Sequence, residues 1–249
     1  MAAQIRYVQL SDEFGCYVPA NDSDDGSEIR FLHQEIFLDN CYLGAGVTLP
    51  SRPVVVDAGA NVGLFSLAAK AARPLATVYA LEPMPATFTA LLANLAHYGH
   101  ADVTALELAL GAMKEDVATF TYYPGLPGNS TRHPESKART RERYPAAARL
   151  LAGGRPVRVR VEPLSDVLDA VGCPRRIDLV KVDVEGAELD VLAGIRDRDW
   201  PRIRQLAVET DQLDAVRELL ERKGFGTTVR VPDGPLREIG TGLVTARRA

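Results

Sequence analysis

Hydrophobic runs of strand length alternate with helical segments through the middle of the chain. The first unit is a buried strand at 54–57, a Gly-rich turn and an Ala-rich helix at 63–72. Strands at 77–81 and 103–108 follow, separated by a helix at 85–98. Alternation of this kind predicts a parallel sheet with helices on both faces and right-handed crossovers.

The same alternation returns in the last third of the chain. Strands are expected at 177–182 and 203–209, each followed by a helix. Segments 227–231 and 243–246 have the alternating pattern of a final antiparallel hairpin. The pattern therefore predicts an α/β fold whose last strands run antiparallel.

Two segments lie outside this alternation. Residues 1–49 are expected to form a strand or hairpin and a helix with one apolar face, and we treat them as an N-terminal cap segment before a domain at 50–249. Residues 123–155 interrupt the domain with a turn-rich loop and a helical stretch broken at Pro145. Insertions beyond a strand end often act as lids, so this segment is expected to cover the site and select the substrate.

Composition describes an ordinary soluble globular chain. Its 249 residues are 46% hydrophobic, which is enough for a substantial core and excludes disorder of the whole. No apolar run approaches the ~20 residues of a membrane-spanning helix, and the N-terminus lacks the pattern of a signal peptide. Three widely spaced cysteines form no disulfide framework, so a cytoplasmic location is expected.

Charge changes the picture when it is assigned by segment. The formal net charge of −4 argues against nucleic acid as the main partner. Residues 132–160, however, hold nine Lys and Arg against two acids, so this window carries +7 and the remainder −11. A basic lid favours an anionic acceptor, such as a phosphate, a carboxylate or an intermediate tethered to an acidic carrier protein. A solvated Arg-rich helix would explain the same charges.

The candidate chemistry starts where the first strand ends, in the pattern Asp57-x-Gly59-x-Asn61-x-Gly63. Glycines at such a junction let a ligand approach backbone N–H groups closely. An acid stands where a dinucleotide fold would have its first glycine; it would repel a pyrophosphate and attract a cation. Glu82 ends the next strand, and its carboxylate suits ribose hydroxyls. Together these features indicate S-adenosylmethionine, with a tight turn and close helix packing as the alternative.

Three blocks of sequence resemble the FkbM-like methyltransferases, class I S-adenosylmethionine-dependent enzymes that mostly methylate hydroxyl oxygens of natural products and glycans. The blocks lie at 57–63, 82–95 and 181–188, and the last, Lys-Val-Asp-Val-Glu-Gly-Ala-Glu, is the most specific. The resemblance covers about residues 50–225. It implies a Rossmann-like class I methyltransferase fold with a mostly parallel seven-stranded sheet and a C-terminal antiparallel hairpin.

The resemblance also implies roles for residues at the ends of the first four strands. Those expected to contact the cofactor are Asp57, Gly59, Asn61 and Gly63 at the methionine end, Glu82 at the ribose, Pro83, Met84, Glu107 and Ala109 at the adenine, and Asp183 beside the transferable methyl.

Methyl transfer requires alignment of acceptor oxygen, methyl and sulfur, and removal of the acceptor's proton. Asp183 and Glu185 at a strand end are the main candidates for the base, and His133 in a polar loop is a third. The alternatives are that Asp183 binds the cofactor amino group, Glu185 caps a helix and His133 is an exposed loop residue. The residues expected to contact the acceptor are Asn129, Ser130 and Glu209. No ligand spacing indicates a metal site.

The sequence therefore predicts an O-methyltransferase acting on a hydroxyl of a small-molecule natural product, a sugar or a carrier-bound intermediate. N-methylation of a similar molecule is the alternative that strand-end carboxylates equally allow, and a non-catalytic cofactor-binding module is a third. Neither nucleic acid nor a membrane is expected as a partner. Residues 1–49 either cap the site of their own chain or pack across a homodimer, and the sequence does not choose between these.

Overall fold

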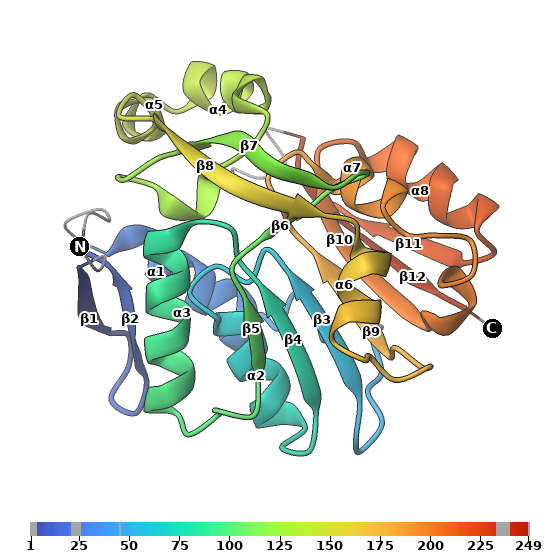
Figure 1. Cartoon of the computed structure of the whole chain (residues 1–249). Coiled ribbons are helices and arrows are strands. Elements are labelled where there is room, and N and C mark those ends of the chain that lie inside the picture. The colour runs from blue at the N-terminus through green and yellow to red at the C-terminus, as the bar shows by residue number, and fades with distance from the viewer. Residues whose placement is uncertain (1–3, 21–25, 45, 233–239, 249) are drawn as a thin grey trace.

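A seven-stranded sheet forms the centre of the molecule (Figure 1). The computed structural model describes residues 4–20, 26–44, 46–232 and 240–248. In spatial order the strands are β11 (Gly226–Arg230), β12 (Gly242–Arg247), β10 (Gln205–Thr210), β9 (Leu179–Val182), β3 (Val54–Ala58), β4 (Thr77–Leu81) and β5 (Thr104–Leu106). Pairing is parallel from β10 to β5 and antiparallel at β12 and β11, which confirms the predicted sheet and its C-terminal hairpin.

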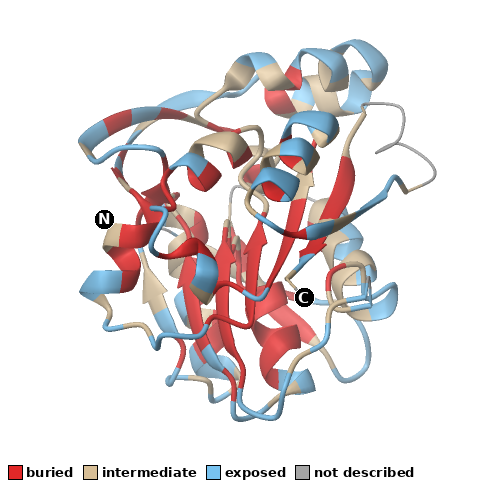
Figure 2. Ribbon diagram, turned by 90° about the vertical axis from the view of Figure 1, so that its right-hand side faces the viewer, coloured by how far each residue is buried: buried red, intermediate tan, exposed pale blue. Residues whose placement is uncertain are grey.

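Both faces of the sheet are covered, so its central strands are buried on both sides (Figure 2). Val56 of β3 packs in a cluster with residues of one group of helices, and Val55 packs in a second cluster with residues of the other group. The helices are α6 (Leu164–Ala170), α7 (Glu188–Ala193) and α8 (Leu213–Arg222) on the first face, and α2 (Leu64–Ala72) and α3 (Pro85–His97) on the second. A strand buried on both faces is a continuous hydrophobic run, which is why the Val54–Val56 run was a reliable signal.

The N-terminal segment has the expected hairpin and helix. Its elements are β1 (Ile5–Gln9), β2 (Gly15–Pro19), α1 (Ser27–His33) and a π-helical continuation η1 (Gln34–Leu38). The buried Asn94 of α3 holds the hairpin, because its side chain accepts from the Tyr17 N–H at 2.6 Å and donates to the Tyr17 carbonyl at 2.9 Å. The π-helix was not predicted from the sequence.

A separate three-stranded sheet lies beside the carboxyl ends of the central strands (Figure 1). It positions the 123–155 insert, here called the lid segment, over those strand ends. Its strands are β6 (Ala109–Leu110), β8 (Arg155–Glu162) and β7 (Glu115–Tyr122). The lid segment contains η2 (Pro127–Asn129), η3 (Pro134–Lys137), α4 (Ala138–Arg143) and α5 (Pro145–Leu151), with the helical break at Pro145 as predicted.

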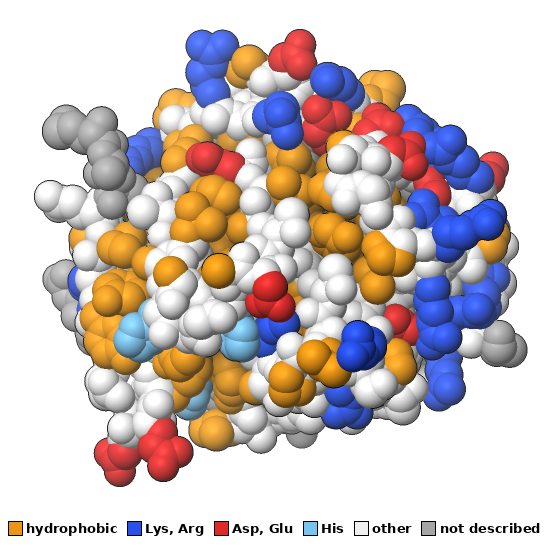
Figure 3. All heavy atoms as spheres, turned by 60° about the horizontal axis from the view of Figure 1, so that its bottom comes forward, with side chains coloured by type: hydrophobic (Ala, Val, Ile, Leu, Met, Phe, Trp, Pro, Cys, Tyr) orange, Lys and Arg blue, Asp and Glu red, His pale blue; other side chains and the backbone are white. Residues whose placement is uncertain are grey.

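Figure 3 brings forward the opposite end of the molecule, where hydrophobic and charged side chains are mixed and Lys and Arg gather toward one side. At this end, ion pairs stabilise the loops that precede the parallel strands. Arg176 lies 2.6 Å from Asp178, whose second carboxylate oxygen accepts the Val54 N–H at 2.9 Å. Buried Lys70 lies 2.6 Å from Asp102. Across the described ranges, no helix has the length and apolar character needed to span a membrane.

Candidate active site

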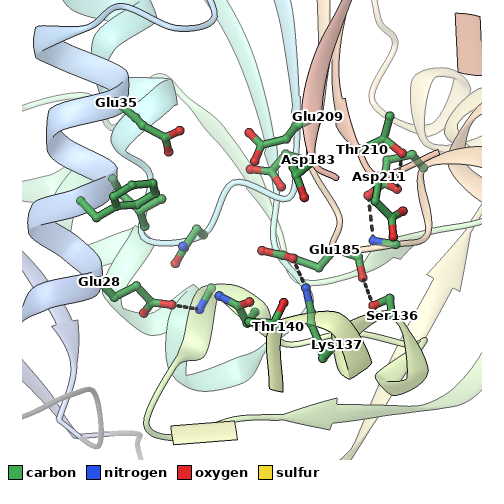
Figure 4. Close-up of a pocket in the computed structure, with 18 of the residues that line it drawn as sticks. Glu28, Glu35, Ser136, Lys137, Thr140, Asp183, Glu185, Glu209, Thr210 and Asp211 are labelled. Carbon is green, nitrogen blue, oxygen red and sulfur yellow. Dashed lines mark hydrogen bonds and ion pairs between the residues drawn. The ribbon is translucent and has the colours of Figure 1, made fainter. Parts of the chain in front are cut away.

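Two cavities meet where the parallel strands end, beneath the lid segment. The first is a slot with mostly apolar walls, and Glu82, Asp183 and Glu185 supply its carboxyl groups. Its walls include Leu81, Met84, Leu108, Ala109 and Phe120. The second is a cleft with about 950 Å³ of empty space, part of it open to solvent (Figure 4). The residues shared by both linings are Asn61, Gly128, Asp183 and Glu185, which therefore stand at the junction.

The slot has the chemistry that an adenosine group needs. Its apolar walls suit a purine ring, and the Glu82 carboxylate suits ribose hydroxyls. That carboxylate accepts the N–H of Asn61 at 2.9 Å and of Met84 at 2.8 Å, while burial raises the pKa of Glu82 to about 7. Gly59 has a φ of +76°, and a Cβ there would lie 1.8 Å from the Asp183 carbonyl oxygen. Only glycine fits this turn without moving the backbone.

Most residues predicted to contact the cofactor line this slot. They are Gly59, Asn61, Glu82, Pro83, Met84, Ala109 and Asp183. Three others are not brought into either cavity. Gly63 faces Leu91 of α3, whose Cδ1 would be 2.6 Å from an added Cβ, and Glu107 is exposed to solvent. The third, Asp57, is a fully buried residue of β3, so its side chain lies inside the protein beneath the turn.

Asp57 acts on the cavities through Lys181. It is fully buried, accepts from Ser66 Oγ at 2.7 Å and lies 3.4 Å from Lys181 Nζ. The same ammonium donates to the Gly59 carbonyl at 2.7 Å and lies 3.4 Å from Asp183 Oδ2. Burial opposes the charge of Lys181, but the Asp183 and Asp57 carboxylates raise its pKa above the usual range. Lys181, whose role the sequence left open, ties the Gly-rich turn to the junction.

Glu185 is held by the lid segment. Its backbone is in the left-handed region at φ 59°, and its carbonyl accepts from Thr131 Oγ1 at 2.6 Å. Its carboxylate pairs with the buried Lys137 ammonium. Burial raises the pKa of Glu185, and Lys137 opposes that rise. Asp183 and Glu185 each lie beside a lysine, Lys181 for Asp183 and Lys137 for Glu185, and both stay candidates for the base.

Asp183 shares a hydrogen-bond partner with Glu209. Tyr42, a buried residue of the N-terminal segment, places its phenol oxygen 3.1 Å from Asp183 Oδ2 and 2.6 Å from Glu209 Oε2. Glu35 of η1 faces the same two carboxyl groups across the cleft (Figure 4). Burial and the nearby Asp183 carboxylate raise the pKa of Glu35 to about 7.

His133 does not join this group. Its Nδ1 lies 3.2 Å from Glu135 and its Nε2 3.1 Å from Asp190, and neither cavity is lined by its ring. The loop turns His133 toward Asp190 of α7, and its role as a base stays a prediction. The residues predicted to contact the acceptor are divided: Asn129 and Glu209 line the cleft, and Ser130 lines the slot.

The cleft is acidic, contrary to the expectation of an anion-binding lid. Its carboxyl groups belong to Glu28, Glu35, Asp183, Glu185, Glu188, Glu209 and Asp211. The cationic side chains in its described lining are Lys137, already paired with Glu185, and Arg139. Arg141 is also occupied, since it donates to the Tyr123 hydroxyl at 2.8 Å. The positive charge of the insert therefore lies mainly outside the cleft, and an anionic group inside it would meet repulsion.

Four functional candidates were missed because their partners are distant in sequence. Glu28 and Glu35 are seven residues apart, so a helical reading could have placed them on one face beside the cleft. Glu28 accepts the N–H of Gly128 in the lid segment at 3.0 Å. Tyr42 and Lys137 carried no local signal. Within the described ranges, no group of three or more His, Cys, Asp or Glu side chains is arranged to hold a metal ion.

A doubly wound sheet with a largely apolar slot at its switch point and carboxyl groups at the strand ends is the arrangement of a class I S-adenosylmethionine-dependent methyltransferase. The chain belongs to the FkbM methyltransferase family, since residues 57–226 match the model described as the methyltransferase FkbM domain. S-adenosylmethionine is the cofactor of this family and of this protein.

Relatives agree with this assignment. The chain is 37% identical over 254 residues to methyltransferase 1 of Beauveria bassiana (strain ARSEF 2860), covering 99% of each chain. It is 38% identical over 231 residues to the 31-O-demethyl-FK506 methyltransferase FkbM of Streptomyces tacrolimicus, covering 85% of this chain and 86% of that one. Among solved structures, methyltransferase FkbM of Methylobacillus flagellatus KT superposes with a TM-score of 0.54 at 17% identity, over 80% of this chain and 45% of the other, which supports the fold.

Proposed function

We propose that this protein transfers a methyl group from S-adenosylmethionine to a hydroxyl oxygen of a small-molecule natural product. The observation that carries the proposal is the place of Asp183, whose side chain stands where the adenosine slot opens into the cleft. The bound cofactor supplies an activated methyl group. The chain has to hold the acceptor in line with it, exclude water and take the acceptor's proton.

In this proposal the residues of the junction have different roles. Asp183 accepts the acceptor's proton, and Lys181, 3.4 Å away, holds that carboxylate in place. Phe31 and Leu32 of α1 give the cleft an apolar wall against which a carbon skeleton packs. The N-terminal segment and the lid segment thus form the two sides of the acceptor site, and the lining of the cleft supports this division of the chain.

The acidity of the cleft favours an oxygen acceptor over an amine. Carboxylates near an amine stabilise its ammonium form, which has no lone pair with which to attack a methyl group. A hydroxyl is uncharged and needs only a base within hydrogen-bond reach. Asp183, with Glu28 and Asp211 elsewhere in the lining of the cleft, therefore supports O-methylation.

The exposed arginines of the insert support a second element of the proposal, an acceptor delivered on an acidic carrier protein. Arg139, Arg143 and Arg149 are all exposed on or beside the lid segment helices. Arg139 also lines the cleft, whereas Arg143, Arg149 and the exposed Arg155 are outside its lining. These three therefore suit a partner that docks on the lid rather than an anionic group that enters the site.

Purified protein, S-adenosylmethionine and a panel of hydroxyl and amine compounds that includes 31-O-demethyl-FK506 test the reaction. Product masses should rise by one CH₂, and fragmentation should place the methyl on oxygen. Asp183→Asn should abolish turnover while calorimetry still shows S-adenosylhomocysteine binding. Methylation on nitrogen alone, or full activity of Asp183→Asn, would refute the proposal.

Carrier docking has its own test. Charge reversal of Arg143, Arg149 and Arg155 to Glu should raise KM for a hydroxyl compound loaded on an acidic carrier protein and leave KM for the free compound unchanged. A matched control reverses three exposed arginines at the opposite end of the molecule, Arg175, Arg204 and Arg247. Equal effects of both triple variants would remove the carrier from the proposal.

A further inference from the structure

One phenol oxygen lies between two carboxyl groups in the wall of the cleft. Tyr42 Oη is 2.6 Å from Glu209 Oε2 and 3.1 Å from Asp183 Oδ2, and both distances are in the hydrogen-bond range. A phenol has a single hydrogen to donate, whereas an ionised carboxylate can only accept. If both carboxylates were ionised, the phenol hydrogen could bond to only one of them. The oxygen of the other carboxylate would then lie at hydrogen-bond distance from Tyr42 Oη with no hydrogen between them. The arrangement is therefore satisfied only when one of the two carboxyl groups is protonated.

The surroundings decide which group holds this proton. Asp183 lies 3.4 Å from the Lys181 ammonium, which stabilises its ionised form, and an ion pair of Glu209 with a Lys or Arg is absent from the described residues. Burial, and next the Asp183 carboxylate, raise the pKa of Glu209 well above its usual range. The titratable and charged groups around Glu209 are Glu35 from η1, Cys41 and Tyr42 from the segment that follows, Lys181, Asp183 and Glu185 from β9 and its end, and Arg230 from β11.

We propose that Glu209, Tyr42 and Asp183 form one proton-sharing unit that positions Asp183 as the base for the acceptor hydroxyl. In this unit the Glu209 carboxyl donates to the Tyr42 oxygen, and the Tyr42 hydroxyl donates to the Asp183 carboxylate. Tyr42 and Glu209 are positioning residues, because they act through Asp183. The inference rests on the proposed O-methylation for its use, and on the two hydrogen-bond distances for its existence.

The proton balance of one turnover follows. As the acceptor oxygen bonds to the methyl carbon, the bond from that carbon to sulfur breaks, and its electron pair leaves with S-adenosylhomocysteine. The acceptor's O–H bond breaks too, and its proton moves to the Asp183 carboxylate. Glu209 then releases its own proton, and the two hydrogen bonds reverse, so that Asp183 donates to Tyr42 and Tyr42 donates to Glu209. The Asp183 proton then moves to Tyr42 while the Tyr42 proton moves to Glu209, which restores the first state. Glu209 also borders a side cavity beside Cys41, Arg230 and Thr241, which gives its proton a route out.

A spectroscopic test asks whether the unit exists, independently of any activity. Infrared spectra at pH 7 should show a protonated carboxyl band that is weaker in Glu209→Gln than in the wild-type protein by the contribution of one group, since Glu35 and Glu82, with pKa values of about 7, contribute to it in both. The exposed Glu135→Gln is the control and should keep the band. A band unchanged in Glu209→Gln would overturn the proposal, whether or not the protein methylates any compound offered to it.

A kinetic test asks whether the unit positions the base. The acceptor is 31-O-demethyl-FK506 or, where the panel identifies another hydroxyl acceptor, that compound. Glutamine at 209 keeps a donor toward Tyr42, so Glu209→Gln should retain the single-turnover rate within about threefold, whereas Glu209→Ala and Tyr42→Phe should lose at least about tenfold in kcat with little change in KM. The wild-type rate should fall at high pH as Glu209 ionises, and Glu209→Gln should lack this fall.

Other outcomes separate the two proposals. Equal loss in Glu209→Gln and Glu209→Ala, or a high-pH fall that persists in Glu209→Gln, would refute the proton-sharing unit and leave O-methylation standing. Absence of methylation by the wild-type protein would refute the proposed function, while the infrared result would still decide whether Glu209 holds the proton.

Discussion

Lys181→Met is the substitution that tests the electrostatic core of the site most directly. The Lys181 side chain is buried, and its ammonium lies between two carboxylates, 3.4 Å from Asp57 Oδ1 and 3.4 Å from Asp183 Oδ2. Asp57 Oδ1 has no hydrogen-bond partner among the described residues and lies 3.4 Å from this ammonium. Methionine keeps most of the volume and removes the charge, so the fully buried Asp57 carboxylate keeps the Ser66 hydrogen bond but loses its ion-pair partner.

The expected loss is large for a single substitution. Removing one partner of a buried ion pair costs about 3–5 kcal/mol. A chain of this size loses roughly 2–4 °C of melting temperature per kcal/mol, so Tm should fall by roughly 6–20 °C. Urea unfolding at pH 7, followed by circular dichroism, measures the free energy directly, and the variant should remain folded because domains have about 5–15 kcal/mol to lose.

The pH dependence and a control sharpen this prediction. The pKa of Lys181 is raised in the folded state, so its stabilisation is complete below the unfolded value of 10.5 and is lost only as the pH rises through the higher folded value. The control is Lys114→Met, an exposed lysine 3.3 Å from Glu162 with its side chain 60% exposed. It should cost less than about 1 kcal/mol. A Lys181→Met protein within about 1 kcal/mol of wild type would refute the reasoning.

Three further predictions concern the turn, the cleft and the N-terminal hairpin. Gly59→Ala should abolish S-adenosylhomocysteine binding in calorimetry, since its Cβ would lie 1.8 Å from the Asp183 carbonyl oxygen; Gly153→Ala has open space around its Cβ and should bind normally, and equal affinities would contradict this account. Glu35→Gln should raise stability to urea more at pH 8 than at pH 5. The pKa of Glu35 is raised from 4.5 to about 7, so the stability of its protonated form is present below 4.5 and lost as the pH rises through 7. The gain should be on the order of 1–3 kcal/mol, and a gain independent of pH would contradict it. Asn94→Ala should cost about 1–3 kcal/mol and expose the hairpin to limited proteolysis, because buried backbone groups of Tyr17 and Val62 lose their partners. Unchanged cleavage at residues 4–20 would show that apolar packing alone holds the hairpin.

Local patterns were sufficient to predict the central sheet. Val54–Val56 and the strand at 179–182 are buried on both faces, so their hydrophobicity is continuous and independent of distant partners. The turn after Val56 was also readable, because Gly59 has to leave space for the Asp183 carbonyl. The three-stranded sheet was not predicted, since β6 is two residues long and its pairing with β8 joins segments some fifty positions apart.

The site shows where the sequence stops being informative about charge. Arginines and lysines at 132–160 form one basic window, yet the fold assigns its members to different tasks. Lys137 turns inward and pairs with Glu185, Arg141 holds Tyr123, and Arg139 stays at the rim of the cleft. Tyr42 is a second residue whose role the sequence could not predict, because no neighbouring residue indicates a site there. Its hydrogen-bond partners, Asp183 and Glu209, are more than a hundred positions away. Net charge by segment describes what a surface could attract only when every charge in the segment is on that surface. Here, contacts inside the fold occupy some cations of the segment, such as Lys137 and Arg141. The lining of the cleft is therefore acidic, although the segment that covers it has a positive net charge.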